Sequence, residues 1–197
     1  MPEKRIYYFD RWGIKNTEKT LQLVKQRAVE IGIHFVVIAT NTGATAVKAF
    51  EMMGDTLKIV AVGSMYGYKE PGKTLMLEEN RIKLGQWGVP MIHTTHAFAG
   101  ISRSVTRMWG GITPLQLLAQ ALKIMGEGFK VCIEVSIMAA DTGAIPMDEN
   151  VIAVGGTIRG ADTAIVLTPA HSNEFFNMRI REIICMPSER PSRFPPV

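Results

Sequence analysis

The sequence has few cysteines and lacks a long uninterrupted apolar stretch. Its 197 residues include two cysteines, Cys132 and Cys185, which are too few for a disulfide framework. Both stand in apolar runs, so we expect them to be reduced residues of the core. No stretch approaches the roughly 18–20 uncharged residues of a membrane helix, and the charged N-terminus is not followed by a signal-peptide core. We therefore expect a cytoplasmic protein with no membrane partner.

The sequence also lacks a cluster of charge of one sign. There are 22 Lys and Arg residues and 18 Asp and Glu residues, which gives a formal net charge of +4. The densest basic stretch, residues 179–193, is interrupted by acidic residues. Proteins that bind nucleic acid usually carry a basic stripe interleaved with aromatic residues. The chain is therefore expected to have no nucleic-acid partner.

Apolar runs of strand length alternate with amphipathic segments along the chain. Hydrophobic residues make up 47% of the sequence and charged residues 20%, which is a globular balance. Near-continuous apolar runs are typical of strands that are covered on both faces. The predicted strands are residues 33–39, 57–62, 131–138, 151–154, 163–167 and 183–186, with a shorter run at 89–92.

Three helices are predicted between these runs. The first starts after the capping residue Asn16 and stops before Gly32. The second covers about residues 44–53. The third has the clearest start, because Thr113 and Gln116 have the spacing of a capping box. This strand–helix–strand alternation predicts an α/β fold with a mainly parallel sheet.

Two segments fall outside the alternation. Residues 63–74 are rich in Gly, Tyr and Lys, which indicates a surface loop or a lid. Residues 187–197 contain four prolines and two arginines, and we expect an extended tail that packs on a neighbour. No break in composition divides the rest, so a single domain is predicted over residues 1–186.

The strongest candidate for a binding site follows the first predicted strand. In open α/β sheets, ligands bind at the carboxyl ends of the strands. Hydroxyl groups, an amide side chain, small residues and the free N–H groups of a helix N-terminus together make an anion site. The segment lacks the lysine of a P-loop, and a helix-capping turn without a ligand is the alternative. Its residues are Thr40, Asn41, Thr42, Gly43, Ala44 and Thr45.

Other predicted strand ends also carry small or polar residues, and their recurrence favours a phosphorylated ligand in a crevice. Two histidines three residues apart suit a metal ion, but no third ligand is near in sequence. We therefore expect no metal, and hydrogen bonding to the ligand instead. The residues are His93, Thr94 and His96, then Gly155, Gly156 and Thr157, and finally residues 168–173.

Glu134 is unusual because it falls in the middle of a predicted strand. It either faces the crevice as a base or hydrogen-bond acceptor, or pairs with an arginine at a sheet edge, and we expect the pairing. No Ser/His/Asp or Cys/His set has diagnostic spacing, so the catalytic residues, if any, stay unknown. The tryptophans Trp12, Trp87 and Trp109 are expected to lie in the core.

Residues 33–46 resemble the first strand, phosphate loop and helix of the C-terminal domain of pyruvate kinases. In that family the loop reads Thr-x-Ser-Gly-x-Ser-Ala and holds a phosphate of a sugar bisphosphate activator. Residues 40–46 match it with Thr for Ser at two places. Residues 160–168 resemble a later strand of the family, and residues 177–179 resemble the entry to its last strand. The resemblance implies a three-layer α/β/α domain with a mainly parallel sheet.

The family includes stand-alone proteins associated with FMN. The resemblance therefore implies that residues 40–45 hold an FMN phosphate and that the isoalloxazine lies across the other strand ends. Residues 169–173 stand where the family has its Gly-rich activator loop. No pyruvate kinase activity is expected, because the catalytic barrel is absent from this chain. A sensor module for a phosphosugar or nucleotide and a small flavin-dependent oxidoreductase are the alternatives. The family's domains associate, which implies a homo-oligomer.

Overall fold

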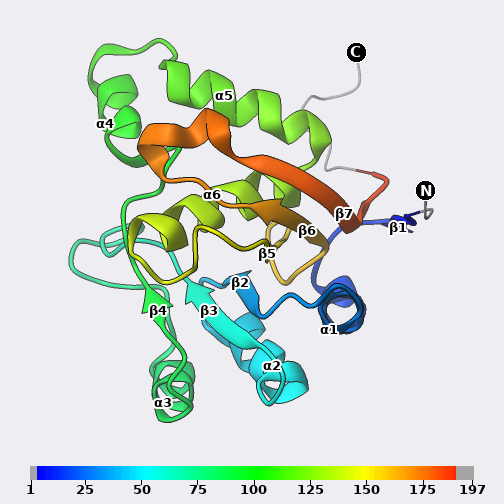
Figure 1. Ribbon diagram of the computed structural model, residues 1–197. Coiled ribbons are helices and arrows are strands. Elements are labelled where there is room, and N and C mark those ends of the chain that lie inside the picture. The colour runs from blue at the N-terminus through cyan, green and yellow to red at the C-terminus, as the bar shows by residue number, and fades with distance from the viewer. Residues whose placement is uncertain (1–3, 190–197) are drawn as a thin grey trace.

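A seven-stranded sheet forms the centre of the structure (Figure 1). The computed structural model describes residues 4–189. The strand order is β1-β7-β6-β5-β2-β3-β4. β2 pairs in parallel with β3 and β5, β3 pairs in parallel with β4, and β1 pairs in parallel with β7, whereas β6 is antiparallel to both neighbours. The strands are β1 (Tyr7–Phe9), β2 (Phe35–Ala39), β3 (Lys58–Val62), β4 (Met91–Ile92), β5 (Val151–Gly155), β6 (Thr163–Thr168) and β7 (Arg179–Pro187).

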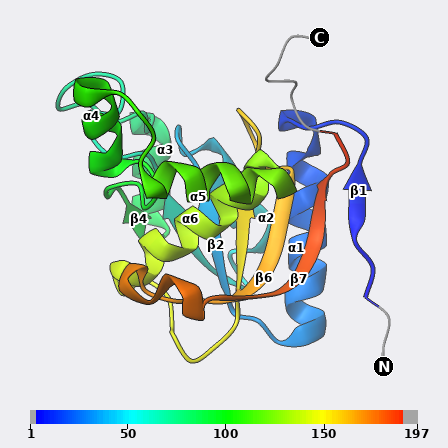
Figure 2. The ribbon, with the colours of Figure 1, turned by 90° about the horizontal axis from the view of Figure 1, so that it is seen from above.

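Helices cover both faces of the sheet, so the predicted three-layer α/β/α fold is confirmed (Figure 2). One layer contains α1, α2 and α3, and the other contains α5 and α6. Within the described chain, no helix is both long and apolar enough to cross a bilayer. The helices are α1 (Thr17–Ile31), α2 (Ala44–Met53), α3 (Glu78–Gln86), α4 (Gly100–Trp109), α5 (Pro114–Leu122) and α6 (Glu127–Asp141), with 3-10 turns at Ile14–Asn16, Lys123–Met125 and Ser172–Asn177.

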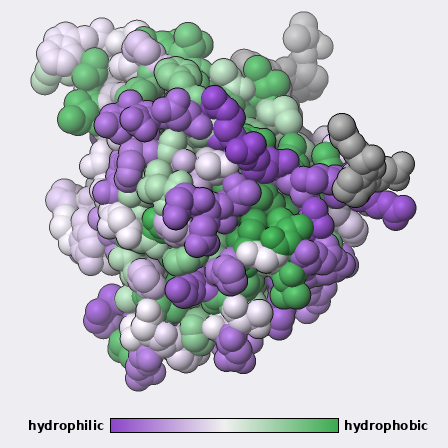
Figure 3. All heavy atoms as spheres, in the orientation of Figure 1, coloured by the Kyte–Doolittle hydropathy of each residue, from purple (hydrophilic) through white to green (hydrophobic). Residues whose placement is uncertain are grey.

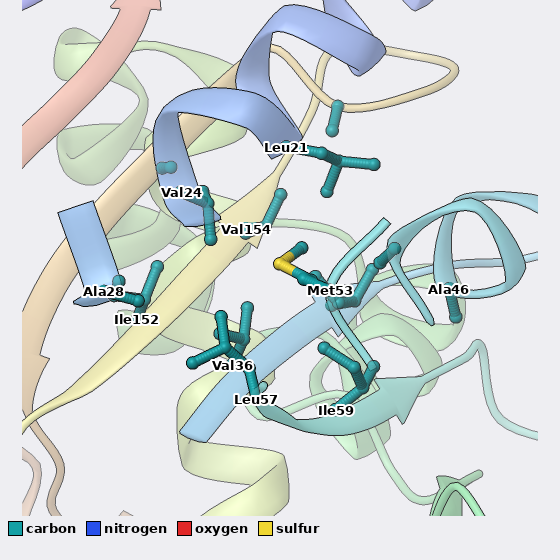
Figure 4. Packing of buried hydrophobic residues seen from close by; sticks show 14 of the residues in the cluster. Leu21, Val24, Ala28, Val36, Ala46, Met53, Leu57, Ile59, Ile152 and Val154 are labelled. Atoms are coloured by element: carbon teal, nitrogen blue, oxygen red, sulfur yellow. The ribbon is translucent and has the colours of Figure 1, made fainter. Parts of the chain in front are cut away.

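The central strand β2 shows why its sequence is apolar at consecutive positions. Val36 points into the core beneath α1 and α2, which also contains Leu21 and Met53 (Figure 4), and Ile38 belongs to the same core. Val37, between them, belongs to the core on the α6 side. Successive side chains of a strand point to opposite faces. A strand that is covered on both faces must therefore be apolar throughout, as predicted.

Three predicted helices are confirmed with small differences at their ends. α2 has the predicted bounds, and α1 ends before Gly32, which adopts a left-handed conformation. At the start of α5, the backbone N–H of Thr113 donates to Gln116 Oε1 at 2.8 Å, which completes the capping box. The side chain of Asn16 does not cap α1 within the described chain. Instead, its Nδ2 donates to the carbonyl oxygen of Arg11 at 2.7 Å.

The prediction of a strand at residues 131–138 is wrong, because these residues lie inside helix α6. Residues 132–140 are all buried, between the sheet and neighbouring elements. A helix that is covered on all sides has no polar stripe, so its sequence loses the 3.6-residue period. Such an apolar run is indistinguishable by pattern from a buried strand.

The antiparallel direction of β6 corrects a second expectation. Residues 168–173 include the last residue of β6 and the loop after it, and therefore lie at the edge of the sheet opposite to the carboxyl ends of β2, β3, β4 and β5. They do not join loop 40–45 in one crevice. β7 is longer than predicted and ends at Pro187, where the predicted tail begins. Ser188 Oγ then donates to the carbonyl oxygen of Phe9 at 2.9 Å, and residues 190–197 of the tail lie outside the described residues.

The cysteines are where they were expected, but two of the tryptophans are not. Cys132 and Cys185 are free and fully buried, and burial raises the pKa of the Cys185 thiol to about 12. Trp87 stacks on Phe50 with a centroid separation of 4.6 Å. Trp12 is exposed, and Trp109 exposes 74% of its surface. The expectation that all three tryptophans lie in the core is therefore wrong.

We predict that Gly155→Ala destabilises the protein, because α6 packs directly on β5 at this residue. A Cβ there would overlap the carbonyl oxygen of Gly128 and lie 3.1 Å from the backbone nitrogen of Cys132. Overpacking of this kind lowers the free energy of unfolding by about 1–3 kcal/mol, and each kcal/mol lowers Tm by about 2–4 °C in a chain of this length. Thermal unfolding followed by circular dichroism measures the change.

Gly85→Ala is the matched control. Gly85 lies in α3 without a positive φ, and a Cβ there would meet only Met91 Cε, at 4.0 Å. Alanine is favoured over glycine in a helix by roughly 0.5–1 kcal/mol, so Tm should stay level or rise. If the two variants lost equal stability, the close approach of α6 would not be the cause.

Candidate functional site

Loop 40–45 connects the carboxyl end of β2 to the N-terminus of α2, as predicted. Gly43 occupies the N-cap position with φ +89°, and within residues 4–189 no side chain caps the helix. The first N–H groups of an α-helix have no partner inside the helix. The loop therefore combines unused backbone donors with the positive end of the helix dipole, which is a favourable environment for an anion.

Thr40 has the most unusual side chain of this loop. Its backbone N–H donates to the carbonyl oxygen of Val62 at 2.9 Å, which anchors it between β2 and β3. The residue is 5% exposed. Among the described residues, Thr40 Oγ1 has no hydrogen-bond partner. Its position continues the alternation of Val36 and Ile38, which point to the α2 layer. A buried hydroxyl without a partner is costly, so this group is available for a ligand.

Gly43 packs closely against the segment that lies behind the loop. A Cβ on Gly43 would lie 2.5 Å from Met76 Sδ and 2.6 Å from Asn80 Cβ. Asn80 also holds the loop, because its Nδ2 donates to the carbonyl oxygen of Thr42 at 2.9 Å, and the N–H of Leu77 donates to the same oxygen at 3.1 Å. Close packing against Met76 and Asn80 therefore favours glycine at this position, and contact between Gly43 and a ligand stays a prediction.

His93 is brought against the same loop by the ends of β3 and β4. A Cβ on Gly63 would lie 2.6 Å from His93 Cε1 and 3.3 Å from the carbonyl oxygen of Thr40. His93 Nδ1 donates to the carbonyl oxygen of Ser64 at 2.9 Å, since a carbonyl only accepts. Ser64 Oγ donates to Asn41 Oδ1 at 2.6 Å. With its oxygen occupied in this way, Asn41 has its Nδ2 donor left for a ligand.

His96 belongs to a different cluster, on the α6 side of the sheet. Its ring stacks on Tyr68 at a centroid distance of 5.3 Å, and the Arg103 guanidinium lies 5.1 Å from the Tyr68 ring centroid. His96 Nδ1 is 4.0 Å from Glu134 Oε2, and Glu134 also pairs with Lys130. His96 Nε2 is buried without a hydrogen-bond partner among the described residues.

The environment of this cluster corrects the prediction for Glu134. The residue is buried on a helix, and its partner is Lys130, one turn earlier on α6, and not an arginine at a sheet edge. Glu134 Oε1 also accepts from the N–H of Phe98 at 3.2 Å. Burial lowers the pKa of His96 below its ordinary value near 6.5. The Glu134 carboxylate opposes that shift, and the Lys130 and Arg103 cations add to it.

Residues 155–157 lie at the same edge of the sheet as loop 40–45, but they have structural partners within the protein. Gly155 packs against α6, and the N–H of Thr157 donates to Asp162 Oδ2 at 3.1 Å. The fully buried Asp162 also accepts from the N–H of Gly13 at 3.0 Å and the hydroxyl of Thr163 at 2.8 Å. Two predicted site residues remain. Thr94, which stands between the two histidines in the sequence, is half-buried, and Gly156 packs against the backbone of residues 160–161.

Sequence reasoning missed the residues that support the site. Ser64, Met76 and Asn80 come from segments that look like an ordinary loop and a polar helix, yet they contact Asn41 or Gly43. Tyr66 lies edge-on to His93 at a centroid distance of 5.5 Å. The sequence feature that could have pointed to Tyr66 is its place in the Gly- and Tyr-rich segment 63–74. In residues 4–189, no three His, Cys, Asp or Glu side chains gather in a way that suits a metal ion.

Comparison with known families adds one finding. Residues 18–167 match the family model described as the alpha/beta domain of pyruvate kinase. The matched region begins in α1 and ends in β6, so it includes loop 40–45, both histidines and the β5–β6 connection. β1 and β7, which extend the sheet at one edge, lie outside the match.

We predict that the burial of His96 makes stability depend on pH. As the pH falls below about 6.5, His96 takes up a proton in the unfolded chain but stays neutral in the folded protein. The free energy of unfolding is therefore full above pH 6.5 and decreases as the pH falls below it. Between pH 7.5 and 5.5, the Tm of the wild type should fall more than that of His96→Gln. His34→Gln removes a histidine whose side chain is 68% exposed and should follow the wild type. Parallel pH profiles for wild type and His96→Gln would contradict the assignment.

Proposed function

Because the chain belongs to the family of the pyruvate kinase alpha/beta domain, we propose that it binds a phosphorylated small molecule at the carboxyl ends of its parallel strands. Loop 40–45 holds the phosphate at the N-terminus of α2. The rest of the ligand extends along the ends of β3 and β4, toward His93 and His96. FMN is the ligand that we propose first.

The unpartnered hydroxyl of Thr40 is the observation that carries this proposal. It is buried beside a helix N-terminus that no described side chain caps. A phosphate oxygen at this position accepts a hydrogen bond from the hydroxyl and from the first N–H groups of α2. One ligand group thus satisfies donors that are otherwise left without partners.

The charge on the site also suits a phosphate held by neutral donors. Residues 40–47 include no charged side chain. The next residue, Lys48, pairs with Glu18 at 2.8 Å. The helix dipole stabilises an anion by typically 0.3–1 kcal/mol. Most of the binding energy therefore comes from hydrogen bonds to charged oxygens, which contribute about 1.5–3 kcal/mol each.

A planar ring system has suitable neighbours beyond the phosphate. Tyr66 and His93 lie edge to face, and His93 is held by Ser64 in one tautomer. Asn41 Nδ2 is a further donor on the same side. When bound, FMN supplies a redox-active isoalloxazine. Loop 40–45 would hold its phosphate, and Asn41, Tyr66 and His93 would face the remainder. Thr157 is left out of this proposal, because its N–H donates to Asp162.

We predict that Thr40→Val changes ligand affinity and stability in opposite directions. The substitution keeps the shape of the side chain and removes the buried hydroxyl. The free energy of unfolding of the ligand-free protein should rise by about 1–2 kcal/mol, because an unpaired buried polar group is lost. The Kd for FMN should weaken roughly 10- to 100-fold, because a hydrogen bond to a charged group is lost. Flavin fluorescence titration and chemical unfolding measure the two effects.

Thr56→Val is the matched control, since Thr56 is an exposed threonine beyond the opposite end of α2. It should change neither quantity by a comparable amount. Protein that is colourless when purified and does not quench FMN fluorescence would overturn the flavin assignment. In that case, thermal shifts with sugar phosphates or nucleotides that Thr40→Val abolishes would still support the phosphate site. If Thr40→Val left every phosphorylated ligand bound, the loop assignment would be wrong.

A further inference from the structure

A group of charged and polar side chains on the α6 side of the sheet is separate from loop 40–45. It consists of His96, Glu134 and Lys130, with Tyr68 stacked on His96 and Arg103 from α4 beside Tyr68. We call this group the His96 cluster. Loop 63–74, which carries Tyr68, lies beside α4 (Figures 1 and 2). Apolar and polar side chains are intermingled over the outside of α4 (Figure 3), so the cluster is not part of a larger charged surface.

One ring nitrogen of His96 faces a carboxylate, and the other has no partner. Nδ1 is 4.0 Å from Glu134 Oε2, which favours a proton on that nitrogen. A neutral imidazole with its proton on Nδ1 has an acceptor at Nε2. Nε2 is buried, and no group in residues 4–189 forms a hydrogen bond with it. Because a buried polar atom without a partner is costly, Nε2 is available to a ligand.

The cations of the His96 cluster outnumber its carboxylate. Glu134 and Lys130 form a pair in which the two side chains are 6% and 12% exposed. Arg103 is half-buried and lies over the ring of Tyr68, and no carboxylate of the described chain pairs with it. With His96 neutral, the cluster therefore carries one unbalanced positive charge. A guanidinium group suits an oxyanion, because its N–H groups can bind two oxygens at once.

We propose that the His96 cluster binds a small oxyanion, a carboxylate or phosphate group, and that His96 takes up a proton from solvent when this anion binds. The anion accepts hydrogen bonds from Arg103 and from Nε2, which becomes a donor once it is protonated. The imidazolium then lies between the anion and Glu134, and both negative groups stabilise it. The N–H bond is the one covalent bond formed. This inference does not rest on the ligand proposed for loop 40–45.

The groups around His96 explain why proton uptake requires the anion. Burial lowers the pKa of His96, and the Lys130 and Arg103 cations lower it further, against the opposing effect of Glu134. Tyr68 is the titratable neighbour that loop 63–74 contributes. An anion on Arg103 offsets part of the repulsion and therefore raises the pKa of His96. By linkage, the anion binds more tightly as the pH falls.

Tyr68 covers the cluster from a loop tip that can move as a unit. Its ring lies 5.3 Å from the ring of His96 at an interplanar angle of 12°. The tip is held by a bond within itself, since the N–H of Gly67 donates to the carbonyl oxygen of Lys73 at 2.9 Å. An outward movement of the tip keeps that bond and uncovers His96 and Arg103, as lid loops do in other binding sites.

The test uses sulfate and acetate as probes, because neither takes up a proton near neutral pH. Sulfate should move the NMR signal of His96 Cε1–H toward its imidazolium position, and the signal of His34, whose side chain is 68% exposed, should not move. Calorimetry in two buffers of different ionisation enthalpy should show proton uptake. A rise of one unit in the pKa of His96 weakens binding roughly tenfold between about pH 5.5 and 7.5. Tighter binding of sulfate indicates a phosphate site, and tighter binding of acetate a carboxylate site.

Three variants and one matched control separate this site from loop 40–45. His96→Gln should abolish both the proton uptake and the pH dependence. Arg103→Gln should weaken sulfate binding roughly tenfold, because a charge-assisted hydrogen bond is lost. Arg107→Gln is the control, since Arg107 is an exposed arginine one turn further along α4. Thr40→Val should leave the proton uptake unchanged, because residues 40–45 include no titratable side chain.

The proposal is wrong if neither probe moves the His96 signal, if sulfate binds without proton uptake, or if Arg103→Gln binds sulfate as tightly as the wild type. Should a variant fail to fold, the NMR titration of the wild type alone decides between the outcomes. None of these results bears on loop 40–45, which is tested by Thr40→Val with phosphorylated ligands.

Discussion

The direct packing of helix α6 on strand β5 determines the positions of most of the groups discussed above. It is possible because Gly155 has no side chain, so the backbone of residues 128–132 lies against the strand. α6 is thereby buried on all sides, and it carries Glu134 and Lys130 to the end of β4, where His96 lies. α5 packs outside α6 and is left with one free surface. One close backbone contact thus positions the helix that carries the buried ionic cluster.

The two sides of the sheet have different chemistry at its carboxyl edge. On the α2 side, the groups near loop 40–45 are neutral, and the local structure is supported by Asn80, Ser64 and His93. On the α6 side, a buried carboxylate, an ammonium group and a neutral histidine lie together. A ligand that crosses the edge would meet hydrogen-bond donors for a phosphate first and titratable groups second.

Local patterns predicted those features whose physical cause is local. The bounds of α2, the capping box of α5 and the apolar strand β2 follow from side-chain period and capping chemistry within about ten residues. The same reasoning failed for α6, because complete burial removes the polar stripe that identifies a helix. It also failed for residues 168–173, since the direction of β6 depends on its partners and not on its sequence.

The sequence by itself determined the layered α/β architecture, the buried cysteines and the loop that follows β2, because each depends on which residues are apolar, small or able to cap a helix. Only the tertiary structure decided what each strand end does. It gave Thr157 a partner in Asp162, left the Thr40 hydroxyl without a partner among the described residues, and placed Trp109 in solvent although its side chain favours burial. Hydrogen-bond satisfaction and burial are properties of contacts between distant segments, so no local pattern encodes them.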